Sequence, residues 1–310
     1  MASLTRVSLV LGALGLAGCG EAGCPEPPAD ETPRLEPGPG LAALDSTPPV
    51  ACPASFLAAA TGAVMDQAGA PVPGARVQLC VRTAPGGALL CLRPPTTDAE
   101  GRFAIPVDTP SARCIEELTV RVRVPGQAAA TTYCTVPPAT DADGVIALDA
   151  ALPFFRLTRP DGCALPPEGD PEAPRDVMLG EGVTLLGLRP AQLDDYDELA
   201  AGAFPLEGTC LAPPEGTVAA WGFAPEGAVE GGVAFELENT TGLAPGTPVE
   251  LHLVGGLDTA LGDGRVLEEA EWARFGTGRV SADGAVITPD PGVRLPELTW
   301  LALVAPGASE

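Results

Sequence analysis

Few residues of this 310-residue chain could carry nucleophilic or acid–base chemistry. A serine or cysteine nucleophile normally needs a histidine base, and the chain has one histidine, His252. Apolar residues alternate with Glu250 and His252 over residues 249–253, so His252 should point outward from a strand. Every basic residue is arginine, which removes lysine Schiff-base and phosphate-loop chemistry. We therefore expect no catalytic site, no cofactor and no enzymatic activity.

The 41 acidic residues leave one catalytic alternative open. So many carboxylates always offer some pair that could hydrolyse a glycosidic bond. A sugar cleft normally needs aromatic platforms, however, and aromatic residues make up only 4% of the chain. The net charge of -24 also argues against nucleic acid and anionic membrane surfaces as partners.

The nine cysteines predict disulfides rather than a metal site. Cys19 follows the short apolar run Val7–Ala17, which is typical of an export signal. Setting Cys19 aside leaves an even number, which in an exported chain indicates up to four bridges. Zinc is disfavoured because the chain has no Cys-x-x-Cys and a single histidine. Symmetry about the intervening turns favours four pairs: Cys80 with Cys91, Cys114 with Cys134, Cys163 with Cys210, and Cys24 with Cys52.

One acidic segment could begin a calcium loop. Asp141 and Asp143 precede Gly144 with suitable spacing, but the distal glutamate of a full ligand series is absent. A plain turn is therefore the favoured interpretation. A second acidic loop, residues 255–271, keeps open the alternative of a module that binds calcium, a carbohydrate or a peptide.

The first 19 residues combine a cation, an apolar run and a cysteine. Met1–Arg6 carries one cation, and Val7–Ala17 is apolar but too short to span a bilayer. Leu16-Ala17-Gly18-Cys19 then resembles the lipobox of a bacterial lipoprotein signal. The resemblance implies that residues 1–18 are removed and that Cys19 carries acyl chains such as palmitate, which bind the membrane. Gly20 follows where an Asp would signal inner-membrane retention, so we expect an outer-membrane location. Residues 19–50, rich in proline and acids, should form an extended tether.

Residues 51–158 show short apolar runs separated by Gly, Pro and Asp turns, as in a β-sandwich. In Leu118–Val124 the alternation places the apolar residues on one face and Thr119, Arg121 and Arg123 toward water. A motif of glycines, prolines and aspartates runs through Gly62, Val64, Asp66, Gly69, Pro71, Pro73, Gly74, Ala75 and Val77, followed by Thr97, Asp98, Gly101 and Phe103. On these residues the segment resembles the carboxypeptidase regulatory-like, or transthyretin-like, family, which implies a non-catalytic accessory sandwich.

Residues 159–310 repeat the strand-and-turn pattern and predict a second β-sandwich. One helix is expected over residues 190–201, because Pro190 stands near its start and Gly202 at its end. The predicted fold is therefore all-β, with two sandwiches in tandem behind a signal peptide and a tether. We expect a lipid-anchored envelope protein that acts as a structural, adhesion or interaction module, with an envelope protein or a glycan as partner.

Overall fold

The computed structural model describes residues 52–148, 150–157, 165, 169–180, 182–206, 209–256 and 259–305. The signal segment, the tether, Cys19, Cys24 and Cys163 lie outside this part, as does the expected boundary near residue 158. The described chain is built almost wholly from strands and short 3-10 turns, which confirms the all-β prediction. No helix in it is long and apolar enough to cross a membrane.

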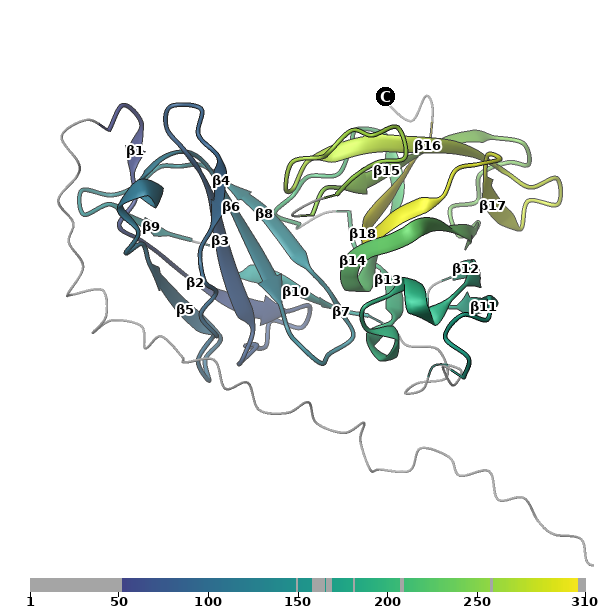
Figure 1. Ribbon diagram of the computed structural model, residues 1–310, viewed down its shortest axis with the longest axis horizontal. Coiled ribbons are helices and arrows are strands. Elements are labelled where there is room, and N and C mark those ends of the chain that lie inside the picture. Colours follow the sequence, from purple (N-terminus) through teal and green to yellow (C-terminus); the bar gives the residue numbers. More distant parts are fainter. Residues whose placement is uncertain are drawn as a thin grey trace, which may run out of the picture.

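The N-terminal region, residues 52–157, consists of two five-stranded sheets (Figure 1). Its elements are β1 (Ser55–Phe56), β2 (Ala59–Asp66), β3 (Arg76–Thr83), β4 (Leu89–Cys91), β5 (Arg102–Pro106), η2 (Pro110–Ala112), β6 (Cys114–Arg123), β7 (Ala129–Ala130), β8 (Thr132–Val136), β9 (Val145–Ala147) and β10 (Leu152–Arg156). One sheet has the order β1-β6-β3-β4, with β8 paired to β6; the other has the order β5-β2-β10-β7, with β9 paired to β2. Apolar side chains from both sheets form one buried cluster, as two facing layers require.

The expected turns of this region are present. Gly69 and Gly101 both have positive φ, and their N–H groups donate to the carbonyls of Asp66 and Asp98. Gly101 also approaches another strand closely, since a Cβ there would lie 2.5 Å from the Val64 carbonyl oxygen. Phe103 and Ile105 are buried, as the two-residue period predicts.

The C-terminal region, residues 169–305, holds an eight-stranded sheet with the order β11-β12-β14-β17-β16-β15-β18 and β13 paired to β14. Its elements are β11 (Arg175–Met178), β12 (Val183–Leu188), η3 (Pro190–Gln192), η4 (Tyr196–Glu198), β13 (Ala200–Ala203), β14 (Thr217–Glu238), β15 (Pro248–Val254), β16 (Trp272–Val280), β17 (Val286–Pro289) and β18 (Leu295–Val304). Because β14 also pairs with β18, the ladder closes on itself. The long strand β14 carries Gly231 and Gly232, both with positive φ, where its register with β18 shifts between Ala228 and Val233.

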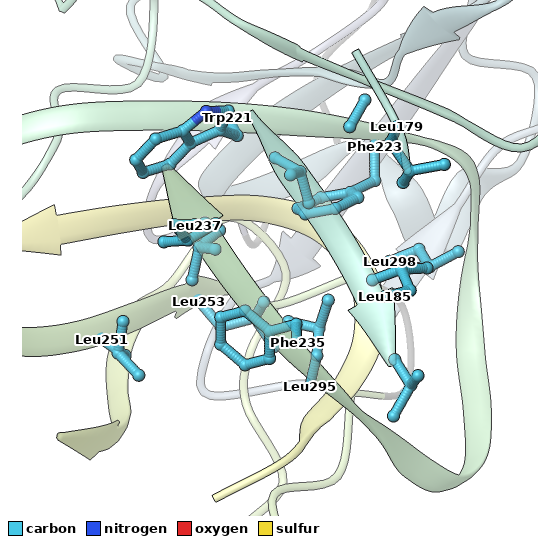
Figure 2. Close-up of a cluster of buried hydrophobic side chains, with 14 of the residues drawn as sticks. Leu179, Leu185, Trp221, Phe223, Phe235, Leu237, Leu251, Leu253, Leu295 and Leu298 are labelled. Carbon is cyan, nitrogen blue, oxygen red and sulfur yellow. The ribbon is translucent and has the colours of Figure 1, made fainter. Parts of the chain in front are cut away.

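The closed ladder surrounds a core of aliphatic and aromatic side chains (Figure 2). Trp221, Phe223 and Phe235 of β14 face Leu253 of β15 and Leu298 of β18 there. Each fully buried side chain of this size contributes roughly 1.5–3 kcal/mol through removal of apolar surface from water. All residues of this core belong to the C-terminal region.

The predicted helix over residues 190–201 is wrong. The segment forms two three-residue 3-10 turns, η3 and η4, and then enters β13, where Ala201 pairs with Phe223 of β14. The backbone is extended at Leu193 and leaves helical values at Asp195, which interrupts a helix. Tertiary contacts decide the outcome, because the buried Gln192 side chain donates to the backbone carbonyls of Glu230 and Gly232.

Three disulfides are present in the described chain: Cys52–Cys114, Cys80–Cys91 and Cys134–Cys210. The expected Cys80–Cys91 pair is confirmed, since these residues face each other across β3 and β4. The expected pairs Cys114–Cys134, Cys163–Cys210 and Cys24–Cys52 are wrong. Register explains the first error, because Cys134 lies opposite Val120, six residues and roughly 20 Å along β6 from Cys114. Cys114 instead lies opposite Phe56 of β1, within reach of Cys52.

Candidate functional site

The outer face of the β3–β6–β8 sheet lies against the C-terminal region rather than against water. Gln78, Arg121 and Tyr133 stand directly opposite one another on these three strands. Arg121 and Tyr133 are buried, whereas Arg123 is exposed. The expected alternation along β6 is therefore confirmed, but the prediction that Arg121 faces solvent is wrong, because the C-terminal region covers it.

Arg121 forms an ion pair with Glu226 of β14 across the contact. Only 6% of the Arg121 side chain and 5% of the Glu226 side chain are exposed. Arg121 also donates through Nη1 to Gln78 Oε1 at 3.2 Å. Glu226 accepts two further hydrogen bonds, from Thr131 Oγ1 and Tyr133 Oη, each at 2.6 Å. The Glu226 carboxylate is thus satisfied almost wholly by residues of the other region.

The pKa values of this cluster follow from burial and pairing. Burial alone would raise the pKa of Glu226, but the Arg121 charge and the hydrogen bonds from Arg121, Thr131 and Tyr133 outweigh it and lower this pKa. Burial and the Glu226 charge raise the pKa of Tyr133 well above its ordinary value. Burial would lower the pKa of Arg121, yet Glu226 and its other neighbours raise it. At neutral pH the cluster therefore holds an ionised pair beside a neutral phenol.

A second carboxyl group, Glu269, contacts the same guanidinium from the loop before β16. Its Oε1 lies 3.3 Å from Arg121 Nε, and only 1% of its side chain is exposed. Neither of these two atoms makes a hydrogen bond with acceptable geometry. Burial raises the pKa of Glu269 to about 7, assisted by the Glu226 charge and opposed by Arg121. Glu226 and Glu269 thus titrate in different pH ranges.

The Cys80–Cys91 disulfide lies next to Glu269, with 3.7 Å between Cys91 Sγ and Glu269 Oε2. These three residues bring potential metal-ligand atoms together. Both sulfurs are consumed in a disulfide, so they cannot act as thiolate ligands. The sulfur also has no proton to donate, so only a protonated Glu269 could hydrogen-bond to it.

An aromatic cluster extends the contact on one side of the ion pair. Trp300 of β18 donates its Nε1–H to the carbonyl of Thr131 at 2.6 Å. Its ring lies 4.5 Å from that of Phe204 and edge-on to Tyr133 at 5.9 Å. Phe155 of β10 also packs on Phe204, at 5.4 Å between ring centroids. Apolar residues of both regions thus form one shared buried cluster.

Covalent and close backbone contacts complete the junction. The Cys134–Cys210 disulfide joins β8 to the segment that leads into β14. Gly222 of β14 lies so close to β7 that a Cβ there would be 2.5 Å from the Ala130 Cβ. At the solvent edge, Arg82 pairs with Glu268 at 2.8 Å. The two regions are therefore joined by a specific interface that combines a disulfide, a close backbone contact and an ion pair.

A groove of about 430 Å³ opens above the ion pair. Arginines line one wall and acidic residues the other: Arg76, Arg121 and Arg123 face Asp194, Asp195, Glu198 and Glu226. Glu198 Oε1 accepts the Gly126 N–H at 2.9 Å and bridges the two walls. Glu269 does not line this groove.

The residues singled out from the sequence do not gather at this interface. His252 lies on β15 with only 16% of its side chain exposed and contacts Glu250 at 3.1 Å, on the polar face as expected. Asp141 Oδ1 accepts the N–H groups of Asp143 and Val145, so the expected turn is present and that oxygen is already engaged. Within the described residues, neither Asp141 nor Asp143 belongs to a cluster that could hold a metal ion.

Sequence reasoning missed Glu226 and Glu269 as members of one cluster. The sequence does carry a signal for Glu226, because Glu226 comes soon after the uncharged run Trp221–Ala224. The structure buries this run within β14. Nothing comparable marks Glu269, which lies among other acids at 268–271.

Comparisons with known proteins add little to this geometry. No protein-family model matches the chain, and no curated protein matches it significantly. Solved structures that resemble it include catechol 1,2-dioxygenase from Acinetobacter sp. ADP1, with 15% identity over 36% of this chain and 56% of that one and a TM-score of 0.23. The match thus spans a little over half of that enzyme.

Two further solved structures are equally distant. The dioxygenase domain of a carbohydrate-binding fusion from Streptomyces sp. SirexAA-E has 17% identity over 40% of this chain and 97% of that one, with a TM-score of 0.21. The major pilin subunit of Bacillus cereus has 12% identity over 77% of this chain and 85% of that one, with a TM-score of 0.20. Similarity at these TM-scores carries no argument about fold or activity.

Proposed function

We propose that the protein is a lipid-anchored, non-catalytic component of the bacterial cell envelope that acts as a structural, adhesion or interaction module. The observation that carries the structural or interaction role is the junction between the two regions, whereas the anchor rests on the lipobox-like residues Leu16–Cys19. There, the Cys134–Cys210 disulfide and the Arg121–Glu226 ion pair join the regions into one unit. Such a junction suits a protein that presents the surfaces of both regions as one linked unit.

The junction does not favour the hydrolase alternative. Glu226 and Glu269 have pKa values displaced in opposite directions, a pattern that carboxylate-dependent hydrolases use. A substrate must reach both groups, however, and the groove reaches Glu226 but not Glu269. Arg121 also contacts both carboxyl groups. These carboxyl groups therefore serve the contact between regions in our proposal.

The N-terminal region is proposed to be a carboxypeptidase regulatory-like domain. Its two facing sheets and its glycine turns at Gly69 and Gly101 support this assignment. A domain of this kind is an accessory module, so the assignment is compatible with a role without catalysis. The family resemblance does not identify the partner.

The membrane anchor is tested by replacing Cys19. We expect Cys19→Ala to move the protein from the membrane to the soluble fraction, because acyl chains supply its attachment. Cys24→Ala is a matched control in the same tether and should stay with the membrane. Unchanged membrane association of Cys19→Ala would refute the anchor.

Calcium binding is the form of the ligand-binding alternative that is most easily measured. An ion that binds only the native state must raise the melting temperature. We expect no rise in melting temperature up to millimolar calcium, because Asp141 Oδ1 already accepts backbone N–H groups and Asp263 already pairs with Arg265. A calcium-dependent rise in melting temperature would favour the alternative.

A further inference from the structure

The buried contact between the regions has unequal numbers of opposite charges. The N-terminal region contributes the guanidinium of Arg121, whereas the C-terminal region contributes the carboxyl groups of Glu226 and Glu269. Glu297 of β18 adds a further buried carboxyl group near Glu226. Glu226 receives hydrogen bonds from Arg121, Thr131 and Tyr133. The one cation that Glu269 contacts among the described residues is Arg121, whose Nε lies near Oε1 without hydrogen-bond geometry. An ionised Glu269 would have to share the Arg121 guanidinium, which already pairs with Glu226.

The groups that face Glu269 provide no second cation among the described residues. From β6 come Arg121 and Thr119, whose hydroxyl is also buried, and from β14 comes Glu226. The uncharged Cys80–Cys91 disulfide, which joins β3 and β4, lies against Glu269. Arg82, on the same sheet face, is engaged by Glu117 and by Glu268 at the solvent edge.

The Glu269 side chain is also sealed from water, with 1% of it exposed. A buried carboxylate without full pairing costs several kcal/mol, whereas a protonated carboxyl group is tolerated far better. Protonation also supplies an O–H that can donate toward the disulfide sulfur, which a carboxylate cannot do. Geometry therefore favours the neutral form of Glu269 in the closed interface.

We propose that Glu269 makes the contact between the two regions responsive to pH: the interface is closed while Glu269 is protonated and loosens when Glu269 ionises. The Cys134–Cys210 disulfide keeps the regions linked in either state. Loosening therefore exposes the polar face of the β3–β6–β8 sheet without separating the regions. The pKa of about 7 for Glu269 places the transition near neutrality.

Acrylamide quenching of tryptophan fluorescence in the full-length protein tests this inference. Trp300 and Trp272 belong to the shared buried cluster, so their accessibility reports loosening of the interface. We expect the quenching constant to rise about twofold between pH 5.5 and pH 8.5, in one step of a single proton near pH 7. In Glu269→Gln, which keeps the shape but cannot ionise, the constant should stay low throughout.

Glu268→Gln is the matched control, because Glu268 adjoins Glu269 and pairs across the same interface but is 64% exposed. Its quenching profile should follow that of the unmodified protein. Two results would overturn the inference: an equal rise in Glu269→Gln, or no rise in the unmodified protein. A midpoint below pH 5 in the unmodified protein would also overturn it, even if Glu269→Gln failed to fold.

Discussion

Arg121 of β6 and Glu226 of β14 form an ion pair that is buried between the two β regions, 105 residues apart in the chain. Pairs of this kind gain strongly from their mutual attraction only while both partners and their hydrogen bonds are present. Thr131 and Tyr133 complete the coordination of Glu226 from the same side as Arg121. The pair therefore specifies how the regions meet, and its loss should destabilise the whole interface.

Removing the cation should destabilise the protein strongly. Arg121→Met leaves Glu226 buried without its counter-charge, and we expect a loss of roughly 3–5 kcal/mol in the free energy of unfolding, measured by urea denaturation. The double variant Arg121→Met/Glu226→Leu removes both charges and should lose clearly less than Arg121→Met alone. Equal losses in the single and double variants would contradict a coupled buried pair.

Stability should depend on pH through Glu269. Its pKa is about 7 in the folded protein and 4.5 ordinarily, so the folded state binds the extra proton between these values. The contribution of Glu269 is thus full below about pH 4.5 and is lost as pH rises to about 7, a change of about 3 kcal/mol. The lowered pKa of Glu226 acts oppositely and removes stability as pH falls below about 4.5.

Urea denaturation between pH 4.5 and pH 8 measures the Glu269 contribution. The unmodified protein should lose stability over this range, whereas Glu269→Gln should have a flatter profile. A parallel fall in both proteins would assign the pH dependence to other groups.

The disulfide between the regions should stabilise more than the hairpin disulfide. Cys134 and Cys210 close a loop of 76 residues, whereas Cys80 and Cys91 close one of 11. In the chain-entropy model these loops correspond to about 4.5 and about 3 kcal/mol. Replacing each pair by serines and comparing melting temperatures checks the order. A larger loss from the hairpin pair would mean that local packing, not loop closure, dominates.

Two glycines of β14 offer a steric test of the interface. Gly222→Ala should wedge the regions apart and cost roughly 1–3 kcal/mol, because the new Cβ would lie 2.5 Å from the Ala130 Cβ. Gly227→Ala, on the same strand, meets nothing within 4 Å and should have little effect. Thermal melts of the two variants distinguish these outcomes. Equal melting temperatures would show that β7 moves aside freely.

Local patterns predicted the local structure well. The alternation in Leu118–Val124 correctly placed Val120 and Val122 in the core, since side-chain direction in a strand follows from its two-residue period. The glycine turns at Gly69 and Gly101 were equally predictable, because a positive φ favours glycine. These features depend on neighbouring residues alone.

Features that depend on distant residues were not predictable. Nothing in β6 indicates that Arg121 is covered by β14, so its polar face was assigned to water. The disulfide partners of Cys114 and Cys134 depend on strand register across the sheet, which spacing in the chain does not encode. The helix predicted for residues 190–201 was wrong for the same reason, because pairing of β13 with β14 overrides the helical pattern of this segment.

The disulfides also determine how tension would travel through the protein. A pull applied between Cys52 and the end of β18 passes directly to Cys114, follows the chain through β6 and β7 to Cys134 of β8, and crosses to Cys210. The segments 53–113 and 135–209 lie off this covalent path. Under tension the chain can therefore lengthen only through residues 114–134 and 210–304, so most of the N-terminal region cannot be drawn out unless a disulfide is reduced.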